Sequence, residues 1–168
     1  MGYTHYWSFN KGPHGKGNAA LSESLWQTAM SECALIARTW NKECKAQGRD
    51  ADRLSGFSAH TKPSQGYGGL HINGKGELAH EDFTMPEHFR DNFEADYNGF
   101  NFCKTARKPY DLVVTACLAV IKHRMGDRIT VTSDGRAIDW NDGVDYARCI
   151  TRLAIKHPVA ERTEREVA

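Results

Sequence analysis

The sequence predicts a single α+β domain, in which a mostly antiparallel sheet is covered on one side by about three helices. Apolar residues repeat at helical spacing in three stretches of the chain. An aromatic N-terminal stretch and two glycine-centred stretches have the composition of a strand and two hairpins. The length of 168 residues suits one ordinary domain. We expect this domain to span residues 1–158, and we expect residues 159–168 to form a charged, frayed tail.

The N-terminal residues 3–9 have the aromatic composition of a strand. In an extended chain, Tyr3, His5 and Trp7 share one face. Their polar tips leave two interpretations open, a half-buried edge strand or a strand that lines a ligand site. Residues 10–18, NKGPHGKGN, are a loop by composition, which is either a basic lid over a ligand or a solvated connection.

The first long helix is predicted over residues 22–47, where one apolar stripe runs from Leu25 to Cys44. Residues 49–69 are polar and turn-rich, and we expect them to form a surface loop. Residues 69–80 predict a hairpin that turns at residues 73–76, with Leu70 and Ile72 facing the core. Residues 87–97 have aromatic side chains four positions apart, which indicates a short helix or a packed loop.

Residues 100–125 combine a strand, a basic loop and the most apolar helix of the chain. Pro109 is expected as the first helical residue, because it lacks the N–H that a helix start leaves unpaired. The apolar run over residues 112–121 predicts a helix that is covered on most of its circumference, and Gly126 is expected to end it. Residues 128–140 predict a second hairpin around Asp134-Gly135, and residues 141–157 predict a last helix.

The composition limits the classes of function. With 22 basic and 21 acidic side chains, the net charge of +1 argues against broad binding of nucleic acid. The five cysteines form no C-x-x-C pair, and four of them fall at apolar positions, which suits a reducing cytoplasm. The chain shows no signal peptide, and its longest apolar run is too short to cross a bilayer. These features predict a protein that acts in the cytoplasm and not in a membrane.

Known catalytic and metal-binding patterns are weak in this sequence. The eight histidines include no H-x-x-x-H or H-E-x-x-H pattern, so we expect neither a metal nor a cofactor. A phosphodiesterase with two strand-borne histidines would need a hydroxyl residue two positions after each, and His5 and His71 both lack it. Whether the protein is an enzyme therefore stays open, and binding is the simpler expectation.

A phosphate site is the candidate that the sequence supports best. Lys104, Arg107 and Lys108 stand before the central helix, whose first N–H groups could hold an anion. The alternative is a solvated loop in which Arg107 pairs with Asp111. The site requires strand 3–7 to lie beside strand 100–104. The predicted ligand-binding residues are Tyr3, His5, Trp7, Lys104, Thr105, Arg107, Lys108 and Tyr110.

The opening GYTHYW (residues 2–7) and the segment FCKTARKPYD (residues 102–111) resemble a group of uncharacterised proteins that are encoded mainly by bacteriophages. The two shared motifs are the GYTHYW opening and FCKTxxxPYD. The resemblance implies a small accessory phage protein in the host cytoplasm, of a kind that often counters host defences. It implies no activity and no catalytic residue.

The leading hypothesis is a phage protein that binds a phosphate-bearing nucleotide and sequesters a host immune signal. Two alternatives remain: a metal-independent phosphodiesterase or nucleotide hydrolase with His5 or His71 as acid or base, and an inhibitor that binds a host defence protein. The expected partner is thus a nucleotide-like small ligand or a host protein, with no membrane and no broad nucleic-acid binding. Homo-oligomer formation stays open.

Overall fold

The computed structural model describes residues 2–10, 19–59, 69–93 and 99–159 of the chain. Within these ranges the chain forms three α-helices and six strands, and the strands make two antiparallel three-stranded sheets. The α+β class and the antiparallel pairing that the sequence predicts are therefore confirmed. The loop expected as a lid falls mostly in residues 11–18 and the tail mostly in residues 160–168, outside the described residues.

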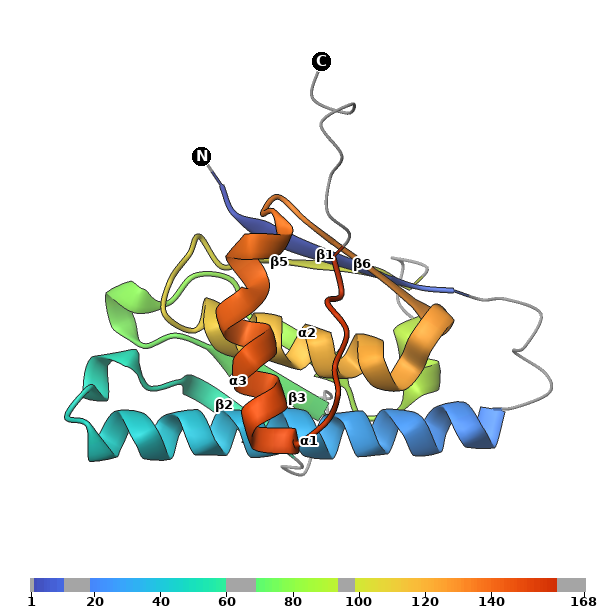
Figure 1. The fold of residues 1–168 in the computed structure, drawn as a ribbon, viewed down its shortest axis with the longest axis horizontal. Helices are drawn as coiled ribbons and strands as arrows, with labels where there is room; N and C mark the ends of the chain where they lie inside the picture. The colour runs from blue at the N-terminus through green and yellow to red at the C-terminus, as the bar shows by residue number, and fades with distance from the viewer. Residues whose placement is uncertain (1, 11–18, 60–68, 94–98, 160–168) are drawn as a thin grey trace, which may run out of the picture.

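The three helices are α1 (Ala19–Ala46), α2 (Asp111–Met125) and α3 (Asn141–Thr151). Helix α2 lies at the centre and packs against both of the others (Figure 1). Residues 113–121 are buried without a break, so the prediction of a helix covered on most of its circumference is confirmed. Gly126 ends α2 at φ 57°, in the left-handed region where glycine carries no Cβ penalty.

The start of α2 differs from the prediction. The helix begins at Asp111, two positions after Pro109, and Tyr110 is its N-cap. Two consecutive turns come first, in which the Lys108 N–H donates to the Thr105 carbonyl at 3.0 Å and the Asp111 N–H to the Lys108 carbonyl at 2.8 Å. The backbone before Asp111 is therefore occupied by turn hydrogen bonds.

The first sheet has the strand order β5-β1-β6, with β1 (Thr4–Phe9) between β5 (Phe100–Lys104) and β6 (Ile129–Ser133). Thr4 lies opposite Lys104, and His5 lies between Cys103 and Ser133. The predicted adjacency of the N-terminal strand and strand 100–104 is therefore confirmed.

The second sheet has the order β2-β3-β4, from β2 (Ser55–Ala59), β3 (Gly69–Asn73) and β4 (Phe83–Pro86). Leu70 and Ile72 are buried, as expected. The prediction of a loop over residues 49–69 was wrong where β2 forms, because pairing with β3 supplies the backbone partners that its turn-rich sequence does not suggest.

Both predicted hairpins are wrong in their return strands. Strand β3 pairs with β4, because the Asn73 carboxamide oxygen accepts the N–H groups of Gly74 and His80 and holds a wide loop between the two strands. Strand β6 pairs with β1, and residues 137–140 form the short 3-10 helix η6 (Ala137–Trp140). The Asp139 carboxylate accepts the Arg136 N–H at 2.8 Å and starts that turn.

Two further expectations concern short segments. Helix α3 ends at Thr151 and not at residue 157, because Arg152 adopts φ 60° and its N–H closes the helix on the Arg148 carbonyl. Cys149, within α3, is exposed, whereas the other four cysteines are buried. The aromatic segment before β5 contains the 3-10 helix η4 (Phe89–Phe93), and residues 94–97 of that expectation lie outside the described residues.

The elements form a layered structure around one core. In Figure 1 the sheet β5-β1-β6 lies at the top, α2 and α3 lie below it, and α1 lies at the bottom near the second sheet. Trp7 of β1 meets Phe83 of β4, with ring centroids 5.3 Å apart, and Phe9 meets Trp26 of α1 at 5.4 Å. The inner face of the first sheet is thus covered by the second sheet and α1.

Candidate functional site

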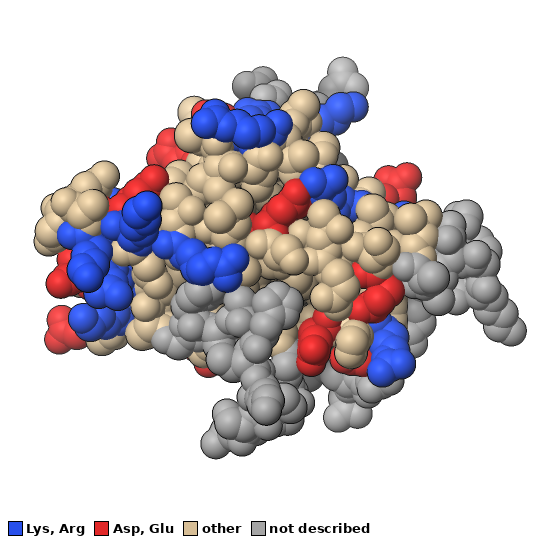
Figure 2. All heavy atoms as spheres, turned by 90° about the horizontal axis from the view of Figure 1, so that it is seen from below, with Lys and Arg blue, Asp and Glu red and all other residues tan. Residues whose placement is uncertain are grey.

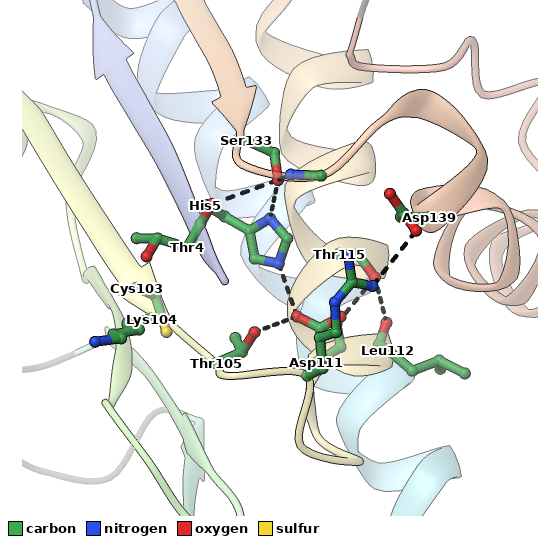
Figure 3. Close-up of polar contacts among 12 residues, drawn as sticks. Thr4, His5, Cys103, Lys104, Thr105, Asp111, Leu112, Thr115, Ser133 and Asp139 are labelled. Atoms are coloured by element: carbon green, nitrogen blue, oxygen red, sulfur yellow. Dashed lines mark hydrogen bonds and ion pairs between the residues drawn. The ribbon is translucent and has the colours of Figure 1, made fainter. Parts of the chain in front are cut away.

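A buried polar network is centred on His5, on the inner face of β1 (Figure 3). Its Nε2 lies 2.7 Å from Asp111 Oδ1 at the start of α2, and its Nδ1 lies 3.0 Å from the Ser133 hydroxyl of β6. A carboxylate can only accept, so Nε2 carries the hydrogen, and Nδ1 of a neutral ring accepts from Ser133. The Thr105 hydroxyl donates to the same Asp111 oxygen. The network ties β1, β6 and the entry to α2 together.

This network explains why the aromatic N-terminal strand carries an imidazole. His5 is 0 % exposed and both of its ring nitrogens have partners, which favours the structural interpretation of the polar tips. The Asp111 carboxylate occupies the first turn of α2, where the sequence analysis placed a ligand anion. The geometry therefore gives no support to His5 as an acid or base. Nε2 of His71, the other candidate acid or base, lies 3.2 Å from Asp82 Oδ2.

Aromatic rings enclose the imidazole. Tyr3 and Trp140 each meet His5 edge to face, with centroids 4.9 and 4.8 Å away. The Arg107 guanidinium lies 3.9 Å above the Tyr3 ring. Burial, together with the nearby Asp111 carboxylate, raises the pKa of Tyr3 to about 12, although Arg107 opposes the shift. Tyr3 therefore stays neutral and acts as a packing surface for Arg107.

The basic loop holds Arg107 in a costly backbone conformation. Ala106 and Arg107 have φ values of 50° and 57°, the only consecutive non-glycine residues with positive φ among the described residues. This conformation costs roughly 1–2 kcal/mol per residue. The N–H groups of Thr105 and Ala106 both donate to the Tyr3 carbonyl, at 3.1 and 3.2 Å, and so fix the turn. The result is an Arg107 side chain laid across Tyr3.

The three cations of the predicted phosphate site have separate partners. Arg107 pairs with Asp139 at 3.4 Å, and Lys108 Nζ donates to the Glu77 carbonyl at 3.0 Å. Lys104 lies on the other face of the sheet, and its side chain points away from His5 (Figure 3). That side chain lies against Gly2. The structure thus brings the eight predicted residues into one region but not into one pocket. Five of them are buried, namely Tyr3, His5, Trp7, Thr105 and Tyr110.

The outer face of the first sheet holds three aromatic residues that are not among the eight predicted ligand-binding residues. Tyr6, Phe100 and Phe102 form a triangle of rings with centroids 6.4–6.5 Å apart. Phe100 and Phe102 are 44 % and 45 % exposed. The signal for them was present, because Tyr6 is on the opposite face of β1 from His5, and Phe100 and Phe102 alternate about Asn101.

The strand register arranges this outer face in three rows. One row holds Phe102, Tyr6 and Thr132, and the next holds Phe100, Ser8 and Thr130. In the third row Thr4 lies between Lys104 and Asp134, because the Thr4 carbonyl accepts the Asp134 N–H at 3.0 Å. We call this surface the open face; its nine residues are Thr4, Tyr6, Ser8, Phe100, Phe102, Lys104, Thr130, Thr132 and Asp134.

The free edge of β5 is closed to a further strand. The Phe102 N–H donates to the carboxamide oxygen of Asn101 at 2.9 Å, and the Lys104 N–H donates to the Glu81 carboxylate at 2.7 Å. Side chains therefore occupy donors that a pairing strand would need. A ligand of this sheet would lie on the open face and not at the β5 edge.

A second surface carries charge on the opposite side of the molecule. Figure 2 shows basic side chains gathered where α1 ends. Arg38, Lys42 and Lys45 are exposed there on one side of the helix. Arg49 and Arg53 nearby are paired with Asp52 and Asp50 at 2.9 and 3.2 Å. Cations near a helix C-terminus interact favourably with the helix dipole. This interaction explains the positions of Lys42 and Lys45 without a bound ligand.

No group of three or more His, Cys, Asp or Glu side chains among the described residues is placed to hold a metal ion. None of the described helices has the length and apolar character needed to cross a membrane.

The fold and the open face define an α+β protein that presents an aromatic sheet surface to solvent. No protein-family model matches the chain, and no curated protein and no solved structure matches it either.

Proposed function

We propose that the protein binds a nucleotide on the open face, with the base against Tyr6, Phe100 and Phe102 and the phosphate at Lys104. The exposed triangle of rings is the observation that carries this proposal. Exposed aromatic clusters on a soluble domain mark interaction sites. Sheet faces with exposed aromatic side chains are a common platform for bases, and each stacked base contributes about 1–3 kcal/mol.

The placement of Lys104 supports a ligand with phosphate. Lys104 follows Phe102 by two positions on β5 and is on the same face, which puts it about 7 Å along the strand. This separation suits a base on Phe102 and a phosphate beside the ammonium group. Of the predicted phosphate ligands, Lys104 is the one that belongs to the open face, so the proposal moves from the loop to the sheet.

The charge of the open face favours a small ligand. Its nine residues include one cation, Lys104, and one anion, Asp134. Binding of a polynucleotide depends on several cations that displace counterions from the backbone, and one lysine balanced by one aspartate does not provide them. A nucleotide with one or two phosphates is the appropriate class. Sequestration of a host immune nucleotide by a phage protein remains part of the proposal, and it depends on the resemblance of residues 2–7 and 102–111.

Isothermal titration with a panel of mononucleotides and cyclic dinucleotides tests the proposal. We expect binding of at least one member, weakened by about fivefold or more in Phe102→Ala, because one stacking ring is lost. Ile138→Ala is the matched control, since Ile138 of η6 is an apolar side chain 65 % exposed that is not one of the nine open-face residues. Absence of heat with every member of the panel would contradict the proposal. Chromatography of the recovered ligand then separates binding from hydrolysis.

The second candidate is binding of a host protein on the same face. The hydroxyl side chains of Ser8, Thr130 and Thr132 border the three rings, which matches an interface with an aromatic centre and a polar rim. Loss of a biological effect in Phe102→Ala, without nucleotide binding by the unchanged protein, would favour this candidate.

A further inference from the structure

Asp134 stands at the β6 end of the open face and is fixed there by two hydrogen bonds. The Thr4 N–H donates to Oδ2 at 3.0 Å, and the Tyr6 hydroxyl donates to Oδ1 at 3.3 Å. The residue is nevertheless exposed. A carboxylate offers about four acceptor sites, so this one keeps acceptor capacity for a ligand. Its position relative to the Tyr6 ring is set before any ligand arrives.

The contact between Asp134 and Tyr6 determines what a stacked base would meet. The hydroxyl at the tip of the Tyr6 ring touches the carboxylate, so a base lying on that ring has one edge next to Asp134. On the other side of Thr4, in the same row, stands Lys104. Lys104 and Asp134 occupy the two outer positions of this row, two strand spacings or about 9.6 Å apart. This is comparable to the span of a nucleotide from base edge to phosphate.

The chemistry of the base edges selects one base. A carboxylate accepts hydrogen bonds and repels acceptor atoms. Guanine carries two adjacent donors, the ring N–H and the exocyclic amine, and so can meet both carboxylate oxygens. Adenine and cytosine place a ring acceptor beside their amine, and uracil flanks its single N–H with two carbonyl oxygens. Only guanine can donate a hydrogen bond to each carboxylate oxygen without placing an acceptor atom beside them.

We infer that the open face prefers guanine nucleotides and that Asp134 is the residue that determines this specificity. The inference rests on the proposed function, because it assigns the base that the ring triangle would hold. A good bidentate contact to a base discriminates by about 1–3 kcal/mol, and the exposure of Asp134 puts the expected preference near the lower end, about tenfold.

Isothermal titration with the monophosphates of guanosine, inosine, adenosine and uridine tests the inference. We expect guanosine monophosphate to bind about tenfold more tightly than the adenosine and uridine compounds. Inosine monophosphate lacks the exocyclic amine and should fall between them. This comparison uses the unchanged protein, so it does not depend on whether a variant folds. Equal affinity for all four compounds overturns the inference and leaves the proposed function standing.

A pair of variants assigns the preference to one residue. Asp134→Asn should reduce the guanosine preference to less than about threefold, because an amide replaces one acceptor by a donor and so no longer repels the ring acceptor of adenine. Asp145→Asn, an exposed aspartate on α3 that pairs with Arg148, is the matched control and should keep the preference. A guanosine preference that survives Asp134→Asn overturns the assignment. If no nucleotide binds the unchanged protein, the proposed function fails together with this inference.

Discussion

At the scale of single residues, His5 shows how a polar side chain can belong to a core. Its ring is sealed by Tyr3 and Trp140, yet each ring nitrogen has a partner of the right kind. A buried polar group without partners would cost a few kcal/mol, whereas this one links three elements. The partners come from residues more than 100 positions away in sequence, so the sequence could suggest the two interpretations but not decide between them.

We predict that His5→Ala lowers the free energy of unfolding by about 2–4 kcal/mol, because it leaves Asp111 without its imidazole partner and opens a cavity. Urea unfolding monitored by circular dichroism measures the change. His123→Ala, at the exposed end of α2, is the control and should change the free energy by less than about 0.5 kcal/mol. Equal small effects of both changes would show that the network contributes little to stability.

The left-handed pair Ala106 and Arg107 was not predictable from composition. Neither residue type favours positive φ, and the turn is fixed by the carbonyl of Tyr3, just before β1, which accepts the N–H groups of Thr105 and Ala106. Strain of this kind persists only where surrounding contacts over-determine the backbone. In this chain it lays Arg107 on Tyr3 and so removes one predicted phosphate ligand from the loop.

At the scale of elements, α1 and the 3-10 helix η4 are joined by one carboxylate. Glu23 accepts from Gln27 at 2.8 Å, from His88 at 2.9 Å and from the Phe89 N–H at 2.9 Å. Burial opposes ionisation of Glu23, but these hydrogen bonds outweigh it and lower its pKa below 4.5. The hydrogen bond to Glu23 in turn raises the pKa of His88 above 6.5.

The two shifts give the contact between α1 and η4 a defined pH window. Glu23 contributes fully above its unfolded-state pKa of 4.5 and loses its contribution as the pH falls through its lowered value. His88 contributes fully below 6.5 and loses its contribution as the pH rises through its raised value. The contact should therefore stabilise the protein most between pH 4.5 and 6.5.

Titration of the His88 ring by nuclear magnetic resonance tests this pair. We expect a midpoint above 6.5 in the unchanged protein and a return toward 6.5 in Glu23→Gln, since the amide carries no charge. Glu77→Gln, an exposed residue of the 3-10 turn η3 (Gly76–Leu78), is the control and should leave the midpoint unchanged. An unchanged midpoint in Glu23→Gln would show that the contact with Glu23 does not raise the pKa of His88.

The hairpins show the limit of element prediction. Alternation correctly placed β3 and β6, because half-buried strands repeat with a period of two. The expected return strands do not form, because two side chains accept backbone N–H groups. Asn73 holds a wide loop after β3, and Asp139 starts a 3-10 turn after β6. Side chains of this type compete locally with strand pairing. Strand β3 consequently pairs with the next strand β4 across a wide loop, and β6 pairs with the distant strand β1.

At the scale of the whole molecule, both sheets and all three described helices share one core. The buried residues form a single cluster that runs from Trp7 and Phe9 through α2 to Phe83 and Ile155. The contact between Trp7 and Phe83 joins the two sheets directly. A continuous core of this kind predicts cooperative behaviour, because no part can lose its packing independently.

We predict one unfolding transition in urea, with coincident midpoints for tryptophan fluorescence and far-ultraviolet circular dichroism. The tryptophans report on the core, since all four are buried. Phe83→Ala, which removes a ring between the sheets, should lower both midpoints together. Two separate transitions would mean that the sheet β2-β3-β4 unfolds on its own.

The sequence by itself determined the helical cores and the N-terminal strand, because periodicity and composition are local properties. The adjacency of strands 3–7 and 100–104 was a requirement of the predicted site, and the structure supplied it. The alternation of Tyr6 and His5, and of Phe102 and Cys103, also divided the two faces. Only the tertiary structure decided which face met the helices. Packing buried His5, Trp7 and Cys103 against α2 and its neighbours, and it left Tyr6 half-buried and the two phenylalanines exposed. Which face is buried depends on elements far away in the chain, and no local pattern contains that information.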